Sequence, residues 1–305
     1  MYNVFLALSP IFILIVMGWI FQRAQFPGPT FWPMAEKITY FVFFPALLFL
    51  SLYQADFSEA DFPVLIVAVS APMLAVCLLM LCFRPLIRIS DPAFSSLFQG
   101  GLRPNTYVGI SAAYIFLGET GLTLSAMVIA IMIPLANTIS VAVVTRMGDN
   151  HSKGWLRAFK SLLTNPLIIA CAAGIVANLS GLRLGLGTDE VVGILSQASL
   201  SLGLLAVGAG LEFRGLVSKW LPIFCSSIFK LAALPLLMGY FALWLGLEAE
   251  VVFVAVIFAS LPCGAAAYVL ARQLGGSLDM MAAIITVQTV AAMISMPLIL
   301  GLFSG

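Results

Sequence analysis

The sequence predicts an all-α polytopic membrane protein, and its composition carries this prediction. Of the 305 residues, 62% are apolar and only 9% are charged, whereas a soluble chain carries about 25% charged residues. The mean hydropathy of +1.11 leaves too little polar surface to cover a globule in water. Fourteen basic residues balance thirteen acidic ones, which excludes a nucleic-acid partner held by a broad basic surface. We therefore expect a lipid bilayer to surround most of the chain.

Ten apolar stretches are each long enough to cross roughly 30 Å of hydrocarbon as a helix. Their hydrophobicity is continuous, with Gly and Pro interruptions and no period-two alternation, so they indicate helices rather than barrel strands. The first stretch lacks a preceding basic residue and a small-residue cleavage site, so we expect it to be a retained span. The predicted spans cover residues 5–22, 36–54, 63–83, 94–117, 121–145, 162–180, 191–211, 221–246, 250–271 and 280–303.

The charges between these spans predict the orientation. If the N-terminus lies outside, the basic loop residues gather on the cytoplasmic side, and only Arg183 lies outside. We therefore expect a multi-pass protein of the cell (inner) membrane with both termini outside. The cytoplasmic basic set is Arg23, Lys37, Arg84, Arg88, Arg146, Lys153, Arg157, Lys160, Arg214, Lys219 and Arg272. The acidic set of the outer loops is Asp56, Glu59, Asp61, Glu119, Asp189, Glu190, Glu248 and Glu250.

The chain divides into two similar halves. The longest hydrophilic stretch predicts a cytoplasmic linker at residues 148–161 between one five-helix repeat at 1–147 and a second at 162–305. Pro10 and Gly18 recur 156 residues later as Pro166 and Gly174. Because each half has an odd number of spans, the second copy enters the bilayer in the opposite sense. This is the 5+5 inverted repeat typical of secondary transporters.

A proline lies near the middle of the fourth and the ninth predicted spans, Pro104 in one and Pro262 in the other. Proline lacks the N–H that a helix needs and clashes with the preceding turn, so we expect both spans to break there. Such breaks persist where they line protein or a water-filled cavity, and their helix N-termini suit an anion. The alternative for any membrane proline is a kink tolerated for packing. Beside the second break, Cys263 and Gly264 are candidate binding residues.

Three polar residues surround the first break. Arg103 lies near the centre of its span, where a charge costs about 2.5 to 3.5 kcal/mol on insertion scales. No span centre contains Asp or Glu to neutralise it, so we interpret Arg103 as a lumen-facing group that attracts substrate anions. Asn105 and Thr106 follow as candidate ligands, although Asn105 could instead bridge two helices as structural glue.

Other polar residues inside spans have more evenly balanced interpretations. Lys230 lies eight residues into the eighth span, where its long side chain could either face a substrate or reach the cytoplasmic interface. Asn137 and Gln288 could each line the cavity or serve packing.

The sequence gives little support to an enzyme. The single histidine, His151, falls in the polar linker, which excludes HExxH zinc chemistry and a Ser-His-Asp triad. Intramembrane aspartyl catalysis needs paired buried aspartates, which the spans lack. The five cysteines lie in apolar runs without metal-ligand spacing. We therefore expect no enzyme activity, no metal and no cofactor.

The sequence RPNTYVG in the fourth span, IPLANTIS in the fifth and LPCGAAAYVLARQLGG in the ninth resemble the auxin efflux carrier family of bacterial and plant transporters, within the bile-acid/sodium symporter-like superfamily. The resemblance implies a PIN-like fold in which broken helices 4 and 9 cross at the substrate site, against a scaffold that often dimerises. Family members carry organic anions such as auxin, malate, malonate or lactate. Pro104 and Asn105 match the family's first crossover and Pro262 its second, whereas Cys263 departs from the usual small or polar residue.

These observations lead to one functional hypothesis and two alternatives. We expect an alternating-access carrier of a small organic anion bound beside Asn105, with a homodimer as a further expectation. Outward movement of an anion is favoured by about 2.3 kcal/mol per 100 mV, so export needs no coupled ion. The first alternative is a sodium-coupled symporter of the same architecture, in which Asn105, Thr106 and Gln288 oxygens hold the ion. The second is a membrane sensor that does not transport.

Overall fold

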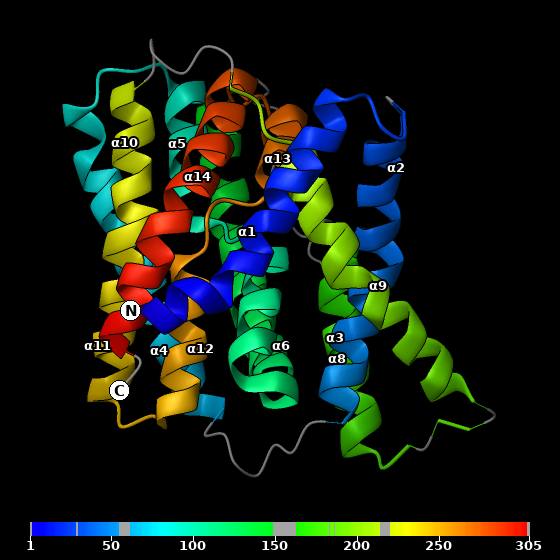
Figure 1. Ribbon diagram of the computed structural model, residues 1–305. Helices are drawn as coiled ribbons and strands as arrows, with labels where there is room; N and C mark the ends of the chain where they lie inside the picture. Colours follow the sequence, from blue (N-terminus) through cyan, green and yellow to red (C-terminus); the bar gives the residue numbers. More distant parts are fainter. Residues whose placement is uncertain are drawn as a thin grey trace.

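The computed structural model describes residues 2–28, 30–54, 62–148, 163–182, 184–185, 187–213 and 220–303. The described chain is all-α (Figure 1). Its first half contains α1 (Tyr2–Arg23), α2 (Phe31–Ile38), a π-helical turn (Thr39–Phe43), α3 (Phe44–Tyr53), α4 (Phe62–Phe83), a 3₁₀ turn (Arg84–Leu86), α5 (Asp91–Leu102) and α6 (Thr106–Met147).

The second half has a similar succession of helices. It contains α8 (Pro166–Leu179), α9 (Thr188–Ala209), α10 (Trp220–Ile228), a second π-helical turn (Phe229–Ala233), α11 (Leu234–Trp244), α12 (Ala249–Ser260), α13 (Ala266–Leu274) and α14 (Leu278–Phe303). Most of the linker predicted at 148–161 lies outside the described residues, with His151, Lys153, Arg157 and Lys160. So do Asp56, Glu59, Asp61, Arg183, Arg214 and Lys219.

The long helix α6 consists of two helical runs that fold back on each other. The backbone reverses at Gly118, where φ is +57° and ψ is −134°, a conformation that only glycine adopts without strain. The reversal brings Gly121 so close to Ala113 that a Cβ on Gly121 would lie 2.2 Å from the Ala113 carbonyl oxygen. One run therefore continues the fourth predicted span, and the other is the fifth.

Seven helical stretches in the described chain are long and apolar enough to cross a membrane, fewer than the ten spans predicted. The other three predicted spans are either a single shorter helix or two helices separated by a break. The sixth is α8, with 14 residues, and the ninth is divided between α12 and α13, with 12 and 9. The fourth is divided between α5 and the first run of α6, which is counted together with the fifth span. The protein is therefore a multi-pass membrane protein, and the ten-span arrangement stays a prediction.

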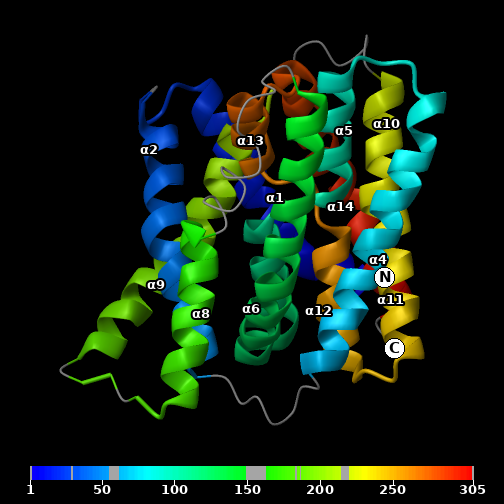
Figure 2. The ribbon, with the colours of Figure 1, turned by 180° about the vertical axis from the view of Figure 1, so that it is seen from behind.

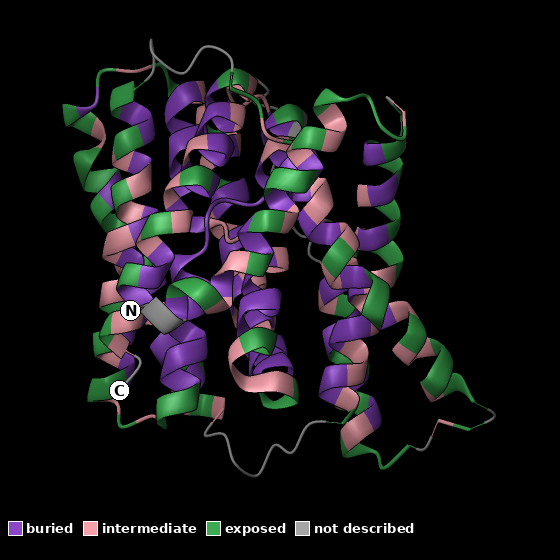
Figure 3. Cartoon of the chain, viewed as in Figure 1, coloured by how far each residue is buried: buried purple, intermediate pink, exposed green. Residues whose placement is uncertain are grey.

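Two short helices form the centre of the bundle. Every residue of α5 from Ala93 onward is buried, and so is every residue of α12 from Val251 onward. Figure 3 shows buried residues along the central helices and exposed residues on the outer faces. The outer faces carry large apolar side chains such as Leu78, Ile194 and Trp244, as expected for surfaces that meet lipid.

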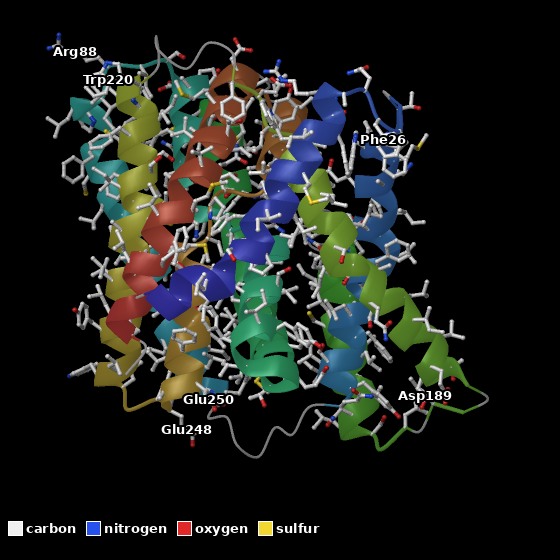
Figure 4. All side chains as sticks on the ribbon, viewed as in Figure 1. Phe26, Arg88, Asp189, Trp220, Glu248 and Glu250 are labelled. Atoms are coloured by element: carbon white, nitrogen blue, oxygen red, sulfur yellow. The ribbon has the colours of Figure 1, made fainter. Side chains whose placement is uncertain are left out.

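Basic and acidic residues lie at opposite ends of the bundle. Arg88 lies at one end, and Asp189, Glu248 and Glu250 lie at the other (Figure 4). The same four residues fall on opposite sides in the loop pattern of the sequence. The loop between α4 and α5, which carries Arg88, is closed by an ion pair of 2.5 Å between Arg84 and Asp91.

Candidate functional site

The first break in the helical backbone lies between α5 and α6. Arg103 is extended, with φ −77° and ψ 120°, because the ring of Pro104 disfavours a helical conformation in the residue before it. Asn105 is also non-helical, and α6 begins at Thr106. The chain therefore crosses this point as an extended segment of three residues.

The second break lies between α12 and α13 and has the same local cause. Leu261, which precedes Pro262, is extended with φ −62° and ψ 146°. The next helix begins only at Ala266. Residues 261–264 are all buried, so this segment is shielded from the surface of the protein.

The two breaks touch each other. Pro104 and Cys263 form an isolated antiparallel β-bridge, and the Asn105 backbone N–H donates to the Pro262 carbonyl oxygen at 2.8 Å. A Cβ on Gly264 would lie 2.7 Å from the Pro104 oxygen and 3.2 Å from the Asn105 Cα, so this approach requires glycine. Figures 1 and 2 show α5 and α13 in one half of the bundle and α12 in the other, whereas α6 extends through both halves. Four helix ends consequently meet near its centre.

A cavity of about 450 Å³ opens beside the meeting point, within the usual size range of small-molecule sites. It faces the N-terminal ends of α6 and α13, because both first turns contribute to its wall. Its lining comes from α2, the first π-helical turn, both breaks, α6, α13 and the start of α8: Pro33, Glu36, Lys37, Tyr40, Phe41, Arg103, Pro104, Asn105, Thr106, Tyr107, Asn137, Thr164, Asn165, Pro166, Gly264, Ala265, Ala266, Val269 and Leu270.

Two cavity-lining side chains carry polar atoms that other protein groups leave unused. Among the described residues, the Arg103 Nη1 and the Asn105 Oδ1 are buried without a hydrogen-bond partner. Buried polar groups are nearly always paired, so these two atoms indicate a place for a ligand or ordered water.

Asn105 differs in this respect from another asparagine of the same cavity. Both residues precede a helix, but Asn165 caps α8 through its Oδ1, which accepts from the Leu167 N–H at 2.9 Å. Asn105 makes no such bond to α6. Because an uncapped first turn keeps N–H groups without intrahelical partners, the start of α6 can still donate to an anion in the cavity.

Comparison with known proteins identifies the class to which this architecture belongs. Residues 155–300 match the model of a family described as membrane transport protein. The comparisons indicate a membrane transporter whose second half is similar to this family. The resemblance drawn from the sequence is thereby confirmed, and the family is one of transporters, not of enzymes.

Alignments with two curated relatives cover most of the chain. A protein of Rhizobium meliloti (strain 1021) named "Putative malonate transporter" is 27% identical over 277 residues, covering 87% of this chain and 85% of the relative. A protein of Methanothermobacter thermautotrophicus named "Uncharacterized transporter" is 25% identical over 291 residues, covering 94% of each chain. Similarity to transporters therefore includes the first half of the chain.

The structure brings six of the predicted site residues together at the cavity and leaves four outside its lining. The six are Arg103, Pro104, Asn105, Thr106, Asn137 and Gly264. The Pro262 carbonyl accepts a hydrogen bond from the Asn105 N–H, and Cys263 is fully buried. Lys230 and Gln288 are also fully buried, and both bond to backbone groups of the broken helices.

The sequence analysis missed several lining residues, including Glu36, Tyr40 and Tyr107. Glu36 matters most, because no carboxylate was expected near Arg103 and the two residues line the same cavity. The second span was predicted to begin at residue 36, whereas α2 begins at Phe31 and places Glu36 within the helix. Pro33 in the preceding sequence was the available signal, since proline is common in a first helical turn.

Proposed function

We propose that the transporter carries small organic anions, such as carboxylates like malonate or indole acids like auxin, by alternating access. The observation that carries this proposal is the cavity beside the two broken helices. There the N-terminal ends of α6 and α13 and the side chain of Arg103 face one space. A helix N-terminus carries about half a positive charge and donates N–H groups, and an arginine binds a carboxylate through two parallel hydrogen bonds.

Glu36 gives the same cavity a way to release its ligand. Glu36 lines the same cavity as Arg103 and carries the opposite charge. When Glu36 and Arg103 approach each other, the Glu36 carboxylate competes with a substrate carboxylate for the guanidinium. A site that must both bind and release benefits from such competition, because uniformly tight binding slows release. Glu36 also provides a carboxylate that could couple transport to protons, so a proton gradient belongs in the test.

We propose further that the two halves form the inverted repeat, with the two broken helices as its crossover. Two close contacts support this symmetry. A Cβ on Gly18 would lie 2.0 Å from the Leu205 oxygen, and one on Gly174 would lie 2.7 Å from the Phe49 oxygen. The two contacts are related by the repeat, because Gly174 lies 156 positions after Gly18 and Leu205 lies 156 positions after Phe49. The packing of α1 on α9 and of α3 on α8 follows the same exchange.

The orientation is part of the proposal. Both termini lie outside, the basic end of the bundle faces the cytoplasm, and a membrane potential that is negative inside drives anions outward.

The sodium-coupled alternative receives less support, because the three oxygens expected to hold the ion do not line one cavity. The Gln288 Oε1 accepts from the Cys263 N–H at 2.9 Å, whereas Asn105 and Thr106 line the cavity. A homodimer formed through the scaffold helices is proposed from the resemblance alone, and native mass spectrometry would test it.

Transport of labelled malonate into proteoliposomes would test this function. We expect flux that follows an imposed membrane potential and persists without sodium, with separate arms that impose a sodium or a proton gradient. Arg103→Gln should abolish most of the flux, whereas Arg88→Gln, which removes an exposed arginine at one end of the bundle, should keep it.

A parallel thermal-shift screen against monocarboxylates, dicarboxylates and indole acids would find the preferred anion, because a ligand of the folded state raises its stability. Ligand binding without any flux would favour the sensor, and the absence of both binding and flux for every anion would overturn the proposal.

A further inference from the structure

Lys230 is a buried residue near the point where the two breaks meet, which we call the crossing, and it does not line the cavity. Lys230 belongs to the π-helical turn between α10 and α11, and its side chain is completely buried. Its Nζ donates to the Ala259 carbonyl oxygen at 3.0 Å. Ala259 is in the last turn of α12, and the final four carbonyls of a helix have no backbone N–H partner within it.

The surroundings of Lys230 offer a helix end in place of a counter-ion. Within the described residues, no carboxylate forms an ion pair with this ammonium group. An ionisable group buried in a span is expensive and needs compensation. The C-terminal end of α12 provides it, because a helix C-terminus carries about half a negative charge.

Two other polar side chains hold the neighbouring backbone on the same side. Ser226, one turn before Lys230, donates to the Leu97 carbonyl of α5 at 3.0 Å. The Gln288 Nε2 donates to the Gly100 carbonyl near the end of α5 at 3.2 Å and to the Ser226 hydroxyl at 3.3 Å. Together with Lys230, these residues attach the C-terminal ends of both α5 and α12 to the helices α10 and α14.

The crossing thus has two faces of opposite polarity. The cavity faces helix N-termini, which favour an anion, whereas the buried face presents helix C-termini, which favour a cation. In transporters with broken helices, exposed carbonyls of this kind commonly hold a coupling ion. We propose that Lys230 is a tethered cation that fills this position permanently. It stabilises the crossing without contacting substrate, and it removes the need for a free cation there.

A variant that vacates this position would test the proposal directly. In the purified full-length chain, Lys230→Ala should lower the midpoint of thermal unfolding by roughly 3 °C or more. Ethylammonium chloride should restore at least half of this loss, because its ammonium group and short chain fit the vacated space, whereas choline chloride at equal ionic strength should not. Sodium and potassium chloride form two further arms. Met238→Ala, at a fully buried apolar position of α11, is the control for a cavity without a lost charge.

A second variant covers the case in which Lys230→Ala does not fold. Lys230→Met keeps the length of the side chain and removes only the charge, and buried ions replaced in this way often leave a protein as stable or more stable. If the charge holds the crossing, malonate flux should fall about tenfold or more. Ethylammonium should not restore flux in Lys230→Met, because the methionine fills the space.

The proposal is overturned by either of two results. One is a Lys230→Ala protein whose unfolding midpoint responds equally to ethylammonium and choline. The other is a Lys230→Met protein whose stability and flux both match the wild type. The unfolding measurements on Lys230→Ala need no substrate, so they would still decide the role of Lys230 if the proposed anion transport failed its own test.

Discussion

The two breaks share a cause but differ in their surroundings. Both follow from a proline in the middle of an apolar helix, and Pro262 comes 158 residues after Pro104. The first break is partly exposed to the cavity and carries unpartnered polar atoms on Arg103 and Asn105. The second is buried, and the Gln288 Oε1 accepts from its Cys263 N–H.

This difference indicates a division of work between the two copies. The unpartnered polar atoms at the first break can respond to a ligand. At the second break, the Cys263 N–H is bonded to Gln288 of α14 and the Pro262 carbonyl to the Asn105 N–H. The departure of Cys263 from the small or polar residue often found there agrees with this division, since a fully buried thiol does not line the cavity. If the first break binds and the second holds, substitutions at each should affect different quantities.

The largest effect should come from the support of the second break. Gln288→Leu removes the acceptor of the Cys263 N–H and the donor to the Gly100 oxygen. Two buried backbone groups would be left unpaired, so we expect the free energy of unfolding to fall by roughly 3 kcal/mol. Chemical or thermal unfolding of the purified protein would measure this.

Ser295→Ala provides the matched control for that variant. Ser295 also lies on α14, and its buried hydroxyl has no hydrogen-bond partner among the described residues. Its removal should leave stability unchanged or slightly raised. Equal losses in the two variants would contradict a special role for Gln288.

The second largest effect should come from the cation of the first break. Arg103→Gln should weaken substrate affinity by about 2 kcal/mol, or roughly thirtyfold, because hydrogen bonds from a charged donor are lost. Stability should stay the same or rise, since the buried Nη1 has no protein partner to lose. Arg103→Lys keeps the charge without the planar fork, so its loss should be smaller. Unchanged affinity in Arg103→Gln would show that the cation does not bind substrate.

The breaks themselves could be predicted from the sequence because their cause is local. A proline disturbs the helix within four residues of itself, and its distance from the repeat partner is visible in the chain. The reversal between the fourth and fifth predicted spans was equally local, because it falls at Gly118. The positions of the helices in the membrane plane depend on contacts between distant residues, and only their symmetry could be predicted from the sequence.

The positions of side chains at the site were more predictable the closer the residues lie to a break in the sequence. Asn105 and Thr106 adjoin Pro104 and line the cavity. Lys230 and Gln288 have the same polar character but face the opposite side of the crossing, which depends on how α10 and α14 pack. Glu36 lies five residues after the start of α2, and hydropathy placed that start too late.

An intermediate effect should come from forcing the breaks apart. Gly264→Ala would place a methyl group 2.7 Å from the Pro104 oxygen, and backbone cannot yield as a flexible side chain can. We expect a loss of about 1.5 kcal/mol in stability, together with a fall in transport, because both breaks must shift. Unfolding and flux measured on one preparation would show both changes.

Gly210→Ala is the control for that variant. The nearest atom to a Cβ on Gly210 is 3.5 Å away, an ordinary contact, so both quantities should stay close to the wild type. A Gly264→Ala protein with normal stability and flux would contradict the tight contact between the breaks.

The smallest effect should come from Asn105→Ala, and it would decide between two roles for this side chain. The backbone bond from Asn105 to Pro262 persists in alanine, and the side chain neither caps α6 nor offers its Oδ1 to another described residue. A ligand role predicts a loss of about 1 kcal/mol, or roughly fivefold, in substrate affinity with unchanged stability. A role as glue between helices predicts the reverse, because a lost bridge destabilises the fold whether or not substrate is present. Binding isotherms and unfolding midpoints from the same variant would separate the two roles, and only the first result keeps the first break as the binding partner of the pair.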